Sequence, residues 1–139
     1  MSKKTKLQGV EELEAKLKGL NTLIVGSRLE LAVKAGAQKI VNAAKQKVPV
    51  RSGTLKRSIN IETTKQEDTF VEVAIGPNTP YAARIEFGYD GKTDKRGRTY
   101  HQQARPYLRP AFDEQVDAAK DTIKKRFVTL INKAAKGEY

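Results

Sequence analysis

The sequence contains no cysteine and a single histidine, so it has no disulfide framework, no thiolate metal site and no histidine cluster. We therefore expect neither a metal nor a cofactor. No apolar run approaches the roughly 18 to 20 residues that cross a bilayer. Lysines at positions 3, 4 and 6 resemble the charged region of a signal peptide, but polar residues interrupt the stretch that follows. The sequence predicts a protein that neither spans a membrane nor is secreted.

Acidic residues are also scarce relative to basic ones, which leaves a net charge of +11 on 139 residues. Such a charge attracts nucleic acid or acidic protein, although most scattered lysines are typical of solvated helix faces. Residues 92–109 differ, because only Asp94 opposes their positive charge and two glycines predict mobility. We leave solvation and contact with an anion or DNA as alternatives there. The candidate anion-facing residues are Lys92, Lys95, Arg96, Arg98, Arg105 and Arg109.

Hydrophobic periodicity predicts two long helices, over about 27–47 and 110–135, and a short helix near 9–20. Pro49 ends the first long helix, and Asp113 and Glu114 suit the positive end of the last one. Between them the period changes to two, which predicts an antiparallel hairpin over about 54–76 with one apolar face. We therefore expect an α+β fold in a single domain, 1–139, with a flexible N-terminus over 1–6 and a flexible basic loop over 89–105.

A further short helix is predicted near 80–88, because Pro80 suits its first turn and Gly88 its end. Its aromatic and aliphatic residues exceed what so short a helix needs, so we expect it to contribute to a contact between subunits. Arg51 lies at a tight turn, and a carboxylate such as Glu86 is one partner for it; solvent exposure of Glu86, or pairing with another arginine, stays open. The candidate interface residues are Arg51, Tyr81, Arg84, Ile85, Glu86 and Phe87.

Catalysis finds little support in the sequence. The single histidine, His101, lies in the basic loop, and no G-x-S-x-G motif accompanies it. The acids of the hairpin fall on or beside its turn, where exposed carboxylates are common, and residues 76–80 lack the lysine and glycine spacing of a P-loop. We therefore expect a protein that is not an enzyme.

Four ordered blocks carry a family resemblance that spans about residues 7–130. They are Gly9-Val-Glu-Glu-Leu, the stretch from Ala43 to Ile59 around Val-Pro-Val-Arg-Ser-Gly, Tyr81-Ala-Ala-Arg-Ile-Glu-Phe-Gly, and Arg105-Pro-Tyr-Leu-Arg-Pro-Ala-Phe. Together they resemble the small neck and tail-completion proteins of long-tailed bacteriophages, the "gene ten" type tail components of lambdoid phages and prophages. The loop over 89–104 is longer and more basic than the family's usual link, so its role is not carried over.

The resemblance implies a structural virion protein, assembled in the host cytoplasm, that acts in the tail or neck as a head-to-tail joining or tail-terminator component. Its implied partners are copies of itself in a ring, with a hexamer as one expected size, connector or stopper proteins, and tail-tube or terminator proteins. Non-specific contact with DNA in the ring lumen is compatible with the charge. The alternative is a stand-alone basic nucleic-acid-binding module, although neither a helix-turn-helix spacing nor an aromatic stacking platform is present.

Overall fold

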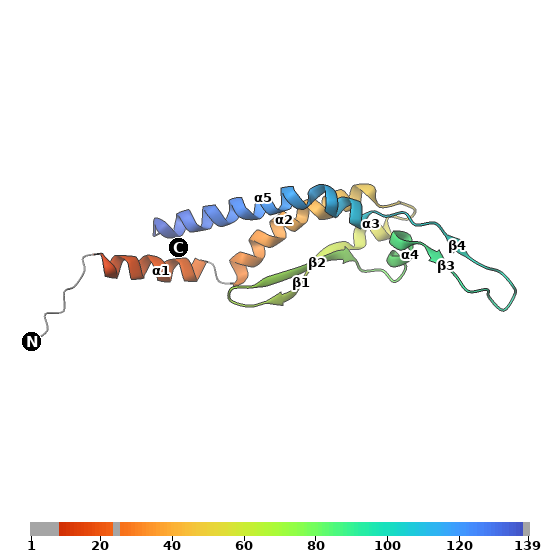
Figure 1. The fold of residues 1–139 in the computed structure, drawn as a ribbon, viewed down its shortest axis with the longest axis horizontal. Coiled ribbons are helices and arrows are strands. Elements are labelled where there is room, and N and C mark those ends of the chain that lie inside the picture. Colours follow the sequence, from red (N-terminus) through yellow and green to blue (C-terminus); the bar gives the residue numbers. More distant parts are fainter. Residues whose placement is uncertain (1–8, 24–25, 138–139) are drawn as a thin grey trace, which may run out of the picture.

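A computed structural model describes residues 9–23 and 26–137, so the predicted flexibility of residues 1–6 lies outside the described residues. The predicted α+β architecture is confirmed: helices accompany a small antiparallel sheet and a short ribbon (Figure 1). In chain order the elements are α1 Val10–Leu23, α2 Gly26–Lys47, α3 Thr54–Ser58, β1 Ile59–Gln66, β2 Val71–Pro77, α4 Ala82–Phe87, β3 Tyr89–Asp90, β4 His101–Gln102 and α5 Leu108–Ala135.

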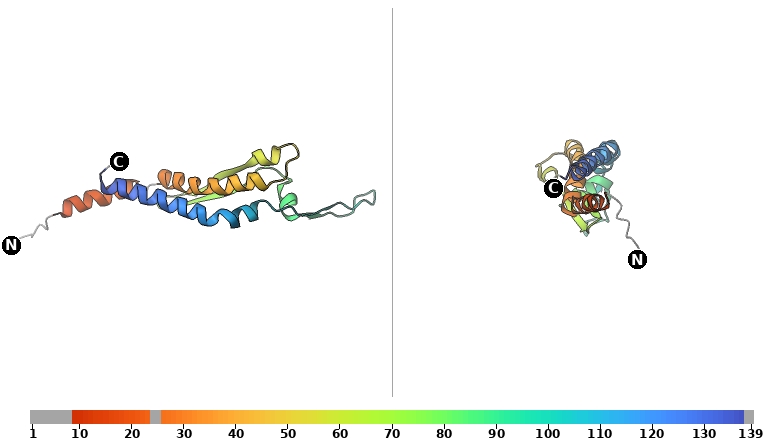
Figure 2. Two further views of the ribbon diagram at one scale, coloured as in Figure 1. Left: turned by 90° about the horizontal axis from the view of Figure 1, so that it is seen from above. Right: turned by 90° about the vertical axis from the view of Figure 1, so that its left-hand side faces the viewer.

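The two long helices α2 and α5 pack side by side, and small residues let them approach closely (Figures 1 and 2). A Cβ atom added at Gly36 would lie 2.6 Å from Cγ1 of Ile123 and 2.7 Å from the carbonyl oxygen of Ala119. An ion pair of 2.6 Å between Lys47 and Glu114 joins the end of α2 to the first turns of α5. Backbone contact at a glycine therefore sets the spacing of this pair.

Strands β1 and β2 form the predicted antiparallel hairpin, and α2 packs on both of them. Ile61 pairs with Ile75 and Thr63 with Val73, which places these half-buried side chains on one face of the sheet. The Thr63 hydroxyl donates a 2.5 Å hydrogen bond to the Glu30 carboxylate of α2. Because α2 contacts the sheet as well as α5, it forms the middle layer of the fold.

The predicted start of the hairpin at residue 54 is wrong, because Thr54–Ser58 form helix α3 and β1 begins at Ile59. Leu55 and Ile59 are both buried, and their spacing of four fits one helix face as well as an alternating strand. Gly53 precedes the helix with φ 77°, a left-handed conformation that glycine adopts without strain. The chain therefore turns from α2 through a short helix before it enters the sheet.

The molecule is elongated, with α1 at one end and the ribbon of β3 and β4 at the other (Figures 1 and 2). Helix α1 contacts α5. Within the described ranges, no helix has the length and apolar character needed to cross a bilayer.

Several apolar residues of the predicted α5 stripe are more exposed than expected. Phe112 and Ile131 are exposed, Phe127 is half-buried, and the fully buried positions of α5 are the alanines 111, 119 and 134. Ile123 of α5 lies against Gly36 of α2 and is half-buried, whereas Phe112 and Ile131 are left exposed. The helix is therefore less deeply packed than its hydrophobic periodicity predicts.

Candidate assembly surface

The main hydrophobic core lies at the end of the molecule from which the ribbon projects. It joins the C-terminal half of α2, α3, the start of β1, α4 and the first turn of α5. Tyr107 is its largest fully buried side chain and is 0% exposed. This core supports a platform, which we define as α3, α4, the Pro49–Gly53 turn and the N-terminus of α5.

Glu86 of α4 binds the N-terminus of α5. Its side chain is only 6% exposed. Oε2 accepts hydrogen bonds from the amides of Tyr107 (2.8 Å) and Leu108 (3.0 Å), and Oε1 accepts one from the amide of Arg109 (3.0 Å). The backbone amide of Arg105 also donates to the carbonyl oxygen of Ile85 at 2.7 Å. These bonds hold α4 against a helix that begins about twenty residues later.

The Glu86 carboxylate accounts for every backbone donor at the start of α5 that lacks a partner within the helix. The N-cap residue Tyr107 makes no side-chain cap, and Pro110 has no amide hydrogen. The first intrahelical bond runs from the amide of Ala111 to the carbonyl of Tyr107. Glu86 is thus a helix cap supplied from another element, and its negative charge also suits the positive end of the helix dipole.

Two titratable groups of the platform are shifted from their ordinary values. Burial is the largest single influence on Glu86 and raises its pKa, but the three amide hydrogen bonds together outweigh burial, so the pKa of Glu86 lies below the usual value. Burial, with the nearby charges of Glu86 and Tyr81, raises the pKa of Tyr107 to about 12. Within the described structure, the Tyr107 hydroxyl has no hydrogen-bond partner. Glu86 therefore stays ionised and Tyr107 neutral at pH 7.

The interpretation of Glu86 as a solvent-facing acid is wrong, and within the described part of the subunit it forms no ion pair with an arginine. Its hydrogen bonds go to backbone amides, and the side chain of Arg51 is exposed at the Pro49–Gly53 turn. A type of residue and its spacing cannot reveal that a carboxylate reaches a helix 21 residues away. The one available signal was negative: α5 begins without Ser, Thr, Asp or Asn at its N-cap and so needs an acceptor from elsewhere.

The other predicted interface residues are brought to one end of the molecule, but not all are covered by the subunit itself. Ile85 is half-buried and packs against the core, whereas Tyr81 is exposed and Phe87 is 78% exposed. The Arg84 guanidinium lies 4.4 Å from the centre of the Tyr89 ring, a cation–π contact that links α4 to the ribbon. The predicted contact between subunits at α4 stays a prediction, and the exposed side chain of Phe87 is free to contact a partner.

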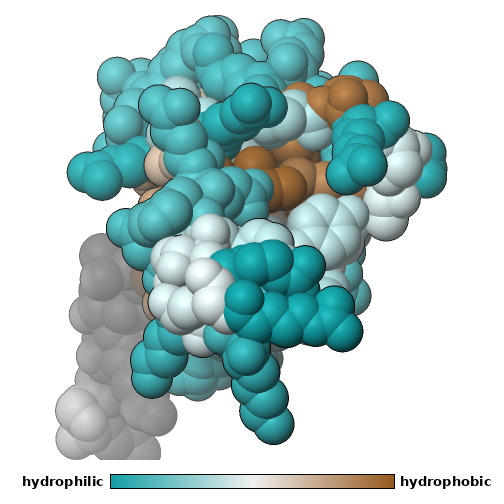
Figure 3. Space-filling model, turned by 90° about the vertical axis from the view of Figure 1, so that its right-hand side faces the viewer, coloured by the Kyte–Doolittle hydropathy of each residue, from teal (hydrophilic) through white to brown (hydrophobic). Residues whose placement is uncertain are grey.

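A cavity of about 790 Å³, which we call the Arg51 cavity, opens beside α4. Its wall combines the apolar side chains of Val50, Tyr81 and Ile85 with the cationic side chains of Arg51 and Arg105, and none of the described residues that line it is acidic. Figure 3 shows this end of the molecule, where hydrophobic residues gather in a hollow that hydrophilic residues surround. The surface is suited to an apolar element that carries negative charge.

The predicted basic loop contains a paired ribbon. Beyond β3 and β4, the amide of Gly91 donates to the carbonyl of Tyr100 and the amide of Asp94 donates to the carbonyl of Arg98, both at 2.9 Å. Gly97 has φ 74°, as in the three-residue hairpin turns that place a glycine in the left-handed region. The segment is therefore a two-stranded hairpin, while its predicted mobility stays a prediction.

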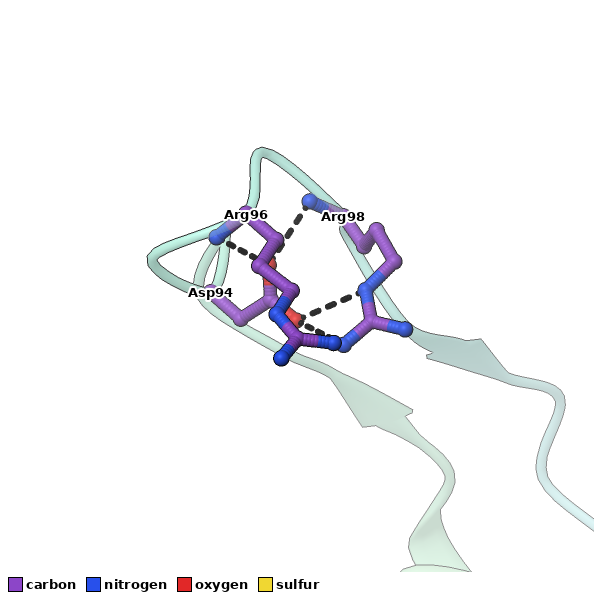
Figure 4. Close-up of polar contacts among 3 residues, drawn as sticks. All are labelled: Asp94, Arg96 and Arg98. Atoms are coloured by element: carbon purple, nitrogen blue, oxygen red, sulfur yellow. Dashed lines mark hydrogen bonds and ion pairs between the residues drawn. The ribbon is translucent and has the colours of Figure 1, made fainter.

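Asp94 organises the turn of the ribbon (Figure 4). Its Oδ1 accepts hydrogen bonds from the amides of Arg96 and Arg98, and its Oδ2 binds Nε and Nη2 of the Arg98 guanidinium at 2.9 Å each. The amide of Arg98, with smaller contributions from the other donors, lowers the pKa of Asp94. Arg98 is therefore largely neutralised within the turn. Among the residues that the structure describes, Lys92, Lys95 and Arg96 are then the turn's exposed cationic side chains without an acidic partner.

The remaining predicted basic residues also lie at this end. Arg105 and Arg109 are both exposed, Arg105 in the wall of the Arg51 cavity and Arg109 in the first turn of α5. His101 of β4 is exposed, and its Nδ1 lies 2.6 Å from Oδ1 of Asp90. In the part of the chain that the structure describes, no three His, Cys, Asp or Glu side chains come together as metal ligands. The two surfaces at this end that could bind a partner are therefore the Arg51 cavity and the basic ribbon.

The fold and this surface define a small α+β protein that presents a platform and a projecting basic ribbon. Residues 11–88, more than half of the chain, match the family model described as "Bacteriophage HK97-gp10, putative tail-component". The chain belongs to this family of phage tail components, as the sequence resemblance predicts. The comparisons with curated proteins and with solved structures gave no significant match.

Proposed function

We propose that this protein is a non-catalytic, ring-forming subunit of the virion that completes the tail or joins it to the head. The proposal rests on family membership and on one observation of the structure: Phe87 lies at the surface of the platform and is 78% exposed. The helix that carries Phe87 is fixed by Glu86, so this exposure is a property of the folded platform. Val50, Tyr81 and Tyr89 are also exposed at this end of the molecule, and a group of exposed apolar side chains, unlike a single one, is typical of a protein interface.

Repeated subunits with a heterologous contact form a closed ring when the rotation between neighbours closes. We propose that such a ring, with a hexamer as one size, contacts connector or stopper proteins on one side and tail-tube or terminator proteins on the other. The protein would then reside in the tail or neck of the virion after assembly in the host cytoplasm. Neck and tail-terminator positions are both compatible with the family description.

Deletion of the gene from the phage or prophage that encodes the protein tests the proposed role. We expect particles with unjoined heads and tails, or tails of defective ends, in negative-stain images, and rescue by the wild-type protein. Phe87→Asp should fold normally but fail to rescue, because the side chain is exposed in the subunit. Phe70→Asp, which changes a phenylalanine that is 45% exposed at the turn between β1 and β2, is the control and should rescue. Normal virions without the protein would refute the proposal.

Ile85→Asp is a poorer test, because Ile85 packs against the core and its replacement would disturb folding. An exposed and a half-buried residue of the same helix thus report different properties. Phe87 reports assembly and Ile85 reports stability.

The ribbon supports a second component of the proposal, contact with a polyanion. Lys92, Lys95 and Arg96 lie on a projecting hairpin without acidic partners in the described structure. Either DNA in a ring lumen or an acidic neighbouring protein would neutralise their positive charges. Replacement of these three residues by serine should leave folding unchanged, since exposed substitutions change stability by about 0.5 kcal/mol at most. DNA retention should fall. The slope of log affinity against log salt concentration should become shallower, by up to about 0.9 for each phosphate that the variant no longer neutralises.

Arg98→Ser is a useful comparison, because Arg98 already binds Asp94 and should contribute less to DNA retention. If wild-type protein does not bind DNA at low salt, the charge serves a protein neighbour. If the triple variant binds DNA as well as the wild type, the ribbon does not bind DNA.

A further inference from the structure

Helix α1 carries an apolar stripe that its own subunit leaves exposed. Val10, Leu13 and Leu17 recur at spacings of three and four and are all largely exposed, whereas Gly19, on roughly the opposite side of the helix, is buried. Helix α1 contacts α5, so the stripe faces away from the covered side. Every residue of α1 from Val10 to Lys18 is exposed, so the apolar stripe is available for a partner.

Acidic residues accompany this stripe. Glu14 lies between Val10 and Leu17 on the helix surface, four residues after the first and three before the second, and it is exposed. Glu11 and Glu12 lie in the first turn, where Glu12 forms an ion pair of 2.9 Å with Lys16 of the same helix, so Glu14 is the acid that the proposal uses. Val10, Leu13 and Leu17 therefore supply apolar anchors at i, i+3 and i+7, as in helices that dock into grooves, and Glu14 lies beside them.

The Arg51 cavity has the complementary character at the opposite end of the elongated molecule (Figure 1). Its apolar side chains include Val50, which is 63% exposed, and its charged side chains are the arginines 51 and 105. Because α1 lies at the other end of the same chain, the helix that meets this cavity belongs to a second copy.

We propose that α1 of one subunit docks into the Arg51 cavity of the next, with Leu13 and Leu17 against Val50 and Tyr81, and with Glu14 facing Arg51 or Arg105. The contact is heterologous, since two different surfaces of the chain meet, and it builds a ring or an open chain of subunits according to the rotation between neighbours. The inference rests on the proposed self-assembly and names two surfaces for it besides the exposed Phe87, which does not line the Arg51 cavity.

Disulfide trapping tests the docking directly, because the chain has no cysteine of its own. A Leu13→Cys chain is mixed with a Val50→Cys chain under mild oxidation. We expect a disulfide-linked heterodimer as the main product. A Val128→Cys chain, which places the thiol on an exposed face of α5, is the control partner for Val50→Cys and should give little product. Equal trapping by Leu13→Cys and Val128→Cys would overturn the proposal.

A second experiment measures assembly by sedimentation velocity. Leu17 and Val128 are both 55% exposed, so Leu17→Asp and Val128→Asp form a matched pair with equal risk to folding. Leu17→Asp should lose self-association, and Val128→Asp should retain it. A mixture of Leu17→Asp and Val50→Asp chains should stop at 1:1 dimers, because each pair keeps one intact α1 and one intact cavity. Assembly of Leu17→Asp at the wild-type level would refute the docking.

Charge exchange completes the test. Glu14→Arg and Arg105→Glu should each weaken assembly, and one chain that carries both changes should recover it. If Glu14→Arg recovers assembly with neither Arg105→Glu nor Arg51→Glu, the proposed ion pair does not form. That result would overturn this orientation of the helix. If the wild type forms rings and every variant forms them equally well, this interface is refuted. The proposed tail function would not be affected by that result. Normal virions without the protein would refute the function instead, whatever the purified chain does.

Discussion

Replacement of Glu86 by alanine removes the acceptor of three amides at the N-terminus of α5. Loss of a helix cap costs about 0.5–2 kcal/mol, and a buried donor left unpaired costs about 1–3 kcal/mol. The bond to Tyr107 is buried, whereas those to Leu108 and Arg109 are partly buried and their amides can reach water. We therefore expect the free energy of unfolding to fall by about 2–4 kcal/mol, less than three full penalties.

Urea unfolding followed by far-ultraviolet circular dichroism measures this loss. In thermal unfolding, Glu86→Ala should lower Tm by roughly 8–16 °C for a domain of this size. Glu62→Ala, which removes an exposed glutamate from β1, is the control and should change stability by about 0.5 kcal/mol at most. Hydrogen exchange should accelerate at the amides of Tyr107, Leu108 and Arg109. An unfolding free energy within about 0.5 kcal/mol of the wild type, with unchanged exchange at these amides, would refute the cap.

The same residue predicts a dependence of stability on pH. The folded state lowers the pKa of Glu86 below its ordinary value of 4.5. The stabilisation is therefore fully present above about pH 4.5 and is lost as the pH falls through the folded pKa. Glu86→Gln should be less stable than the wild type at pH 7, and the difference should shrink in acid. A constant difference from pH 7 into the acid range would contradict ionisation of the cap.

Three further substitutions test the packing. Gly36→Ala should destabilise by about 1–3 kcal/mol in urea, because its Cβ would meet the Ala119 carbonyl oxygen at 2.7 Å; a gain in stability would mean that the helices separate without cost. Phe127→Ala should cost about 1.5–2.5 kcal/mol, below the roughly 3–5 kcal/mol of a fully buried phenylalanine, and a loss near the upper value would show deeper burial. Tyr107→Phe should be neutral or stabilising by about 1–2 kcal/mol, since the buried hydroxyl has no partner among the described residues, and a marked loss would reveal one. The pKa of Tyr107 is raised to about 12, so the wild type should lose stability as pH rises above 10, and Tyr107→Phe should reduce that loss in alkaline unfolding curves.

The main elements of this protein could be predicted from the sequence because their signals are local. The periodicity of α2 and its end before Pro49 depend on residues within the helix, and the predicted range 27–47 differs by one residue from the observed start. The same holds for α5, whose start at Leu108 lies two residues before the predicted one. The family could also be predicted, since its signal lies in short ordered blocks along the chain.

Short segments gave weaker signals. Leu55 and Ile59 fit a strand and a helix equally well, so only the packing of α3 in the core decided between them. The ribbon was predicted as a loop because its pairing is short and its turn depends on one carboxylate, Asp94, that bridges residues along the hairpin.

Only the tertiary structure decided the role of Glu86 and the character of the surface around it. The contact of a carboxylate with amides 21 to 23 residues away depends on how α4 lies against α5, and no periodicity or motif records that geometry. Exposure follows the same logic: Ile85 and Phe87 are similar by type, yet the first packs on the core and the second points away from it. Hydrophobicity is a property of each residue, which the sequence determines, whereas burial depends on neighbours that the fold brings together.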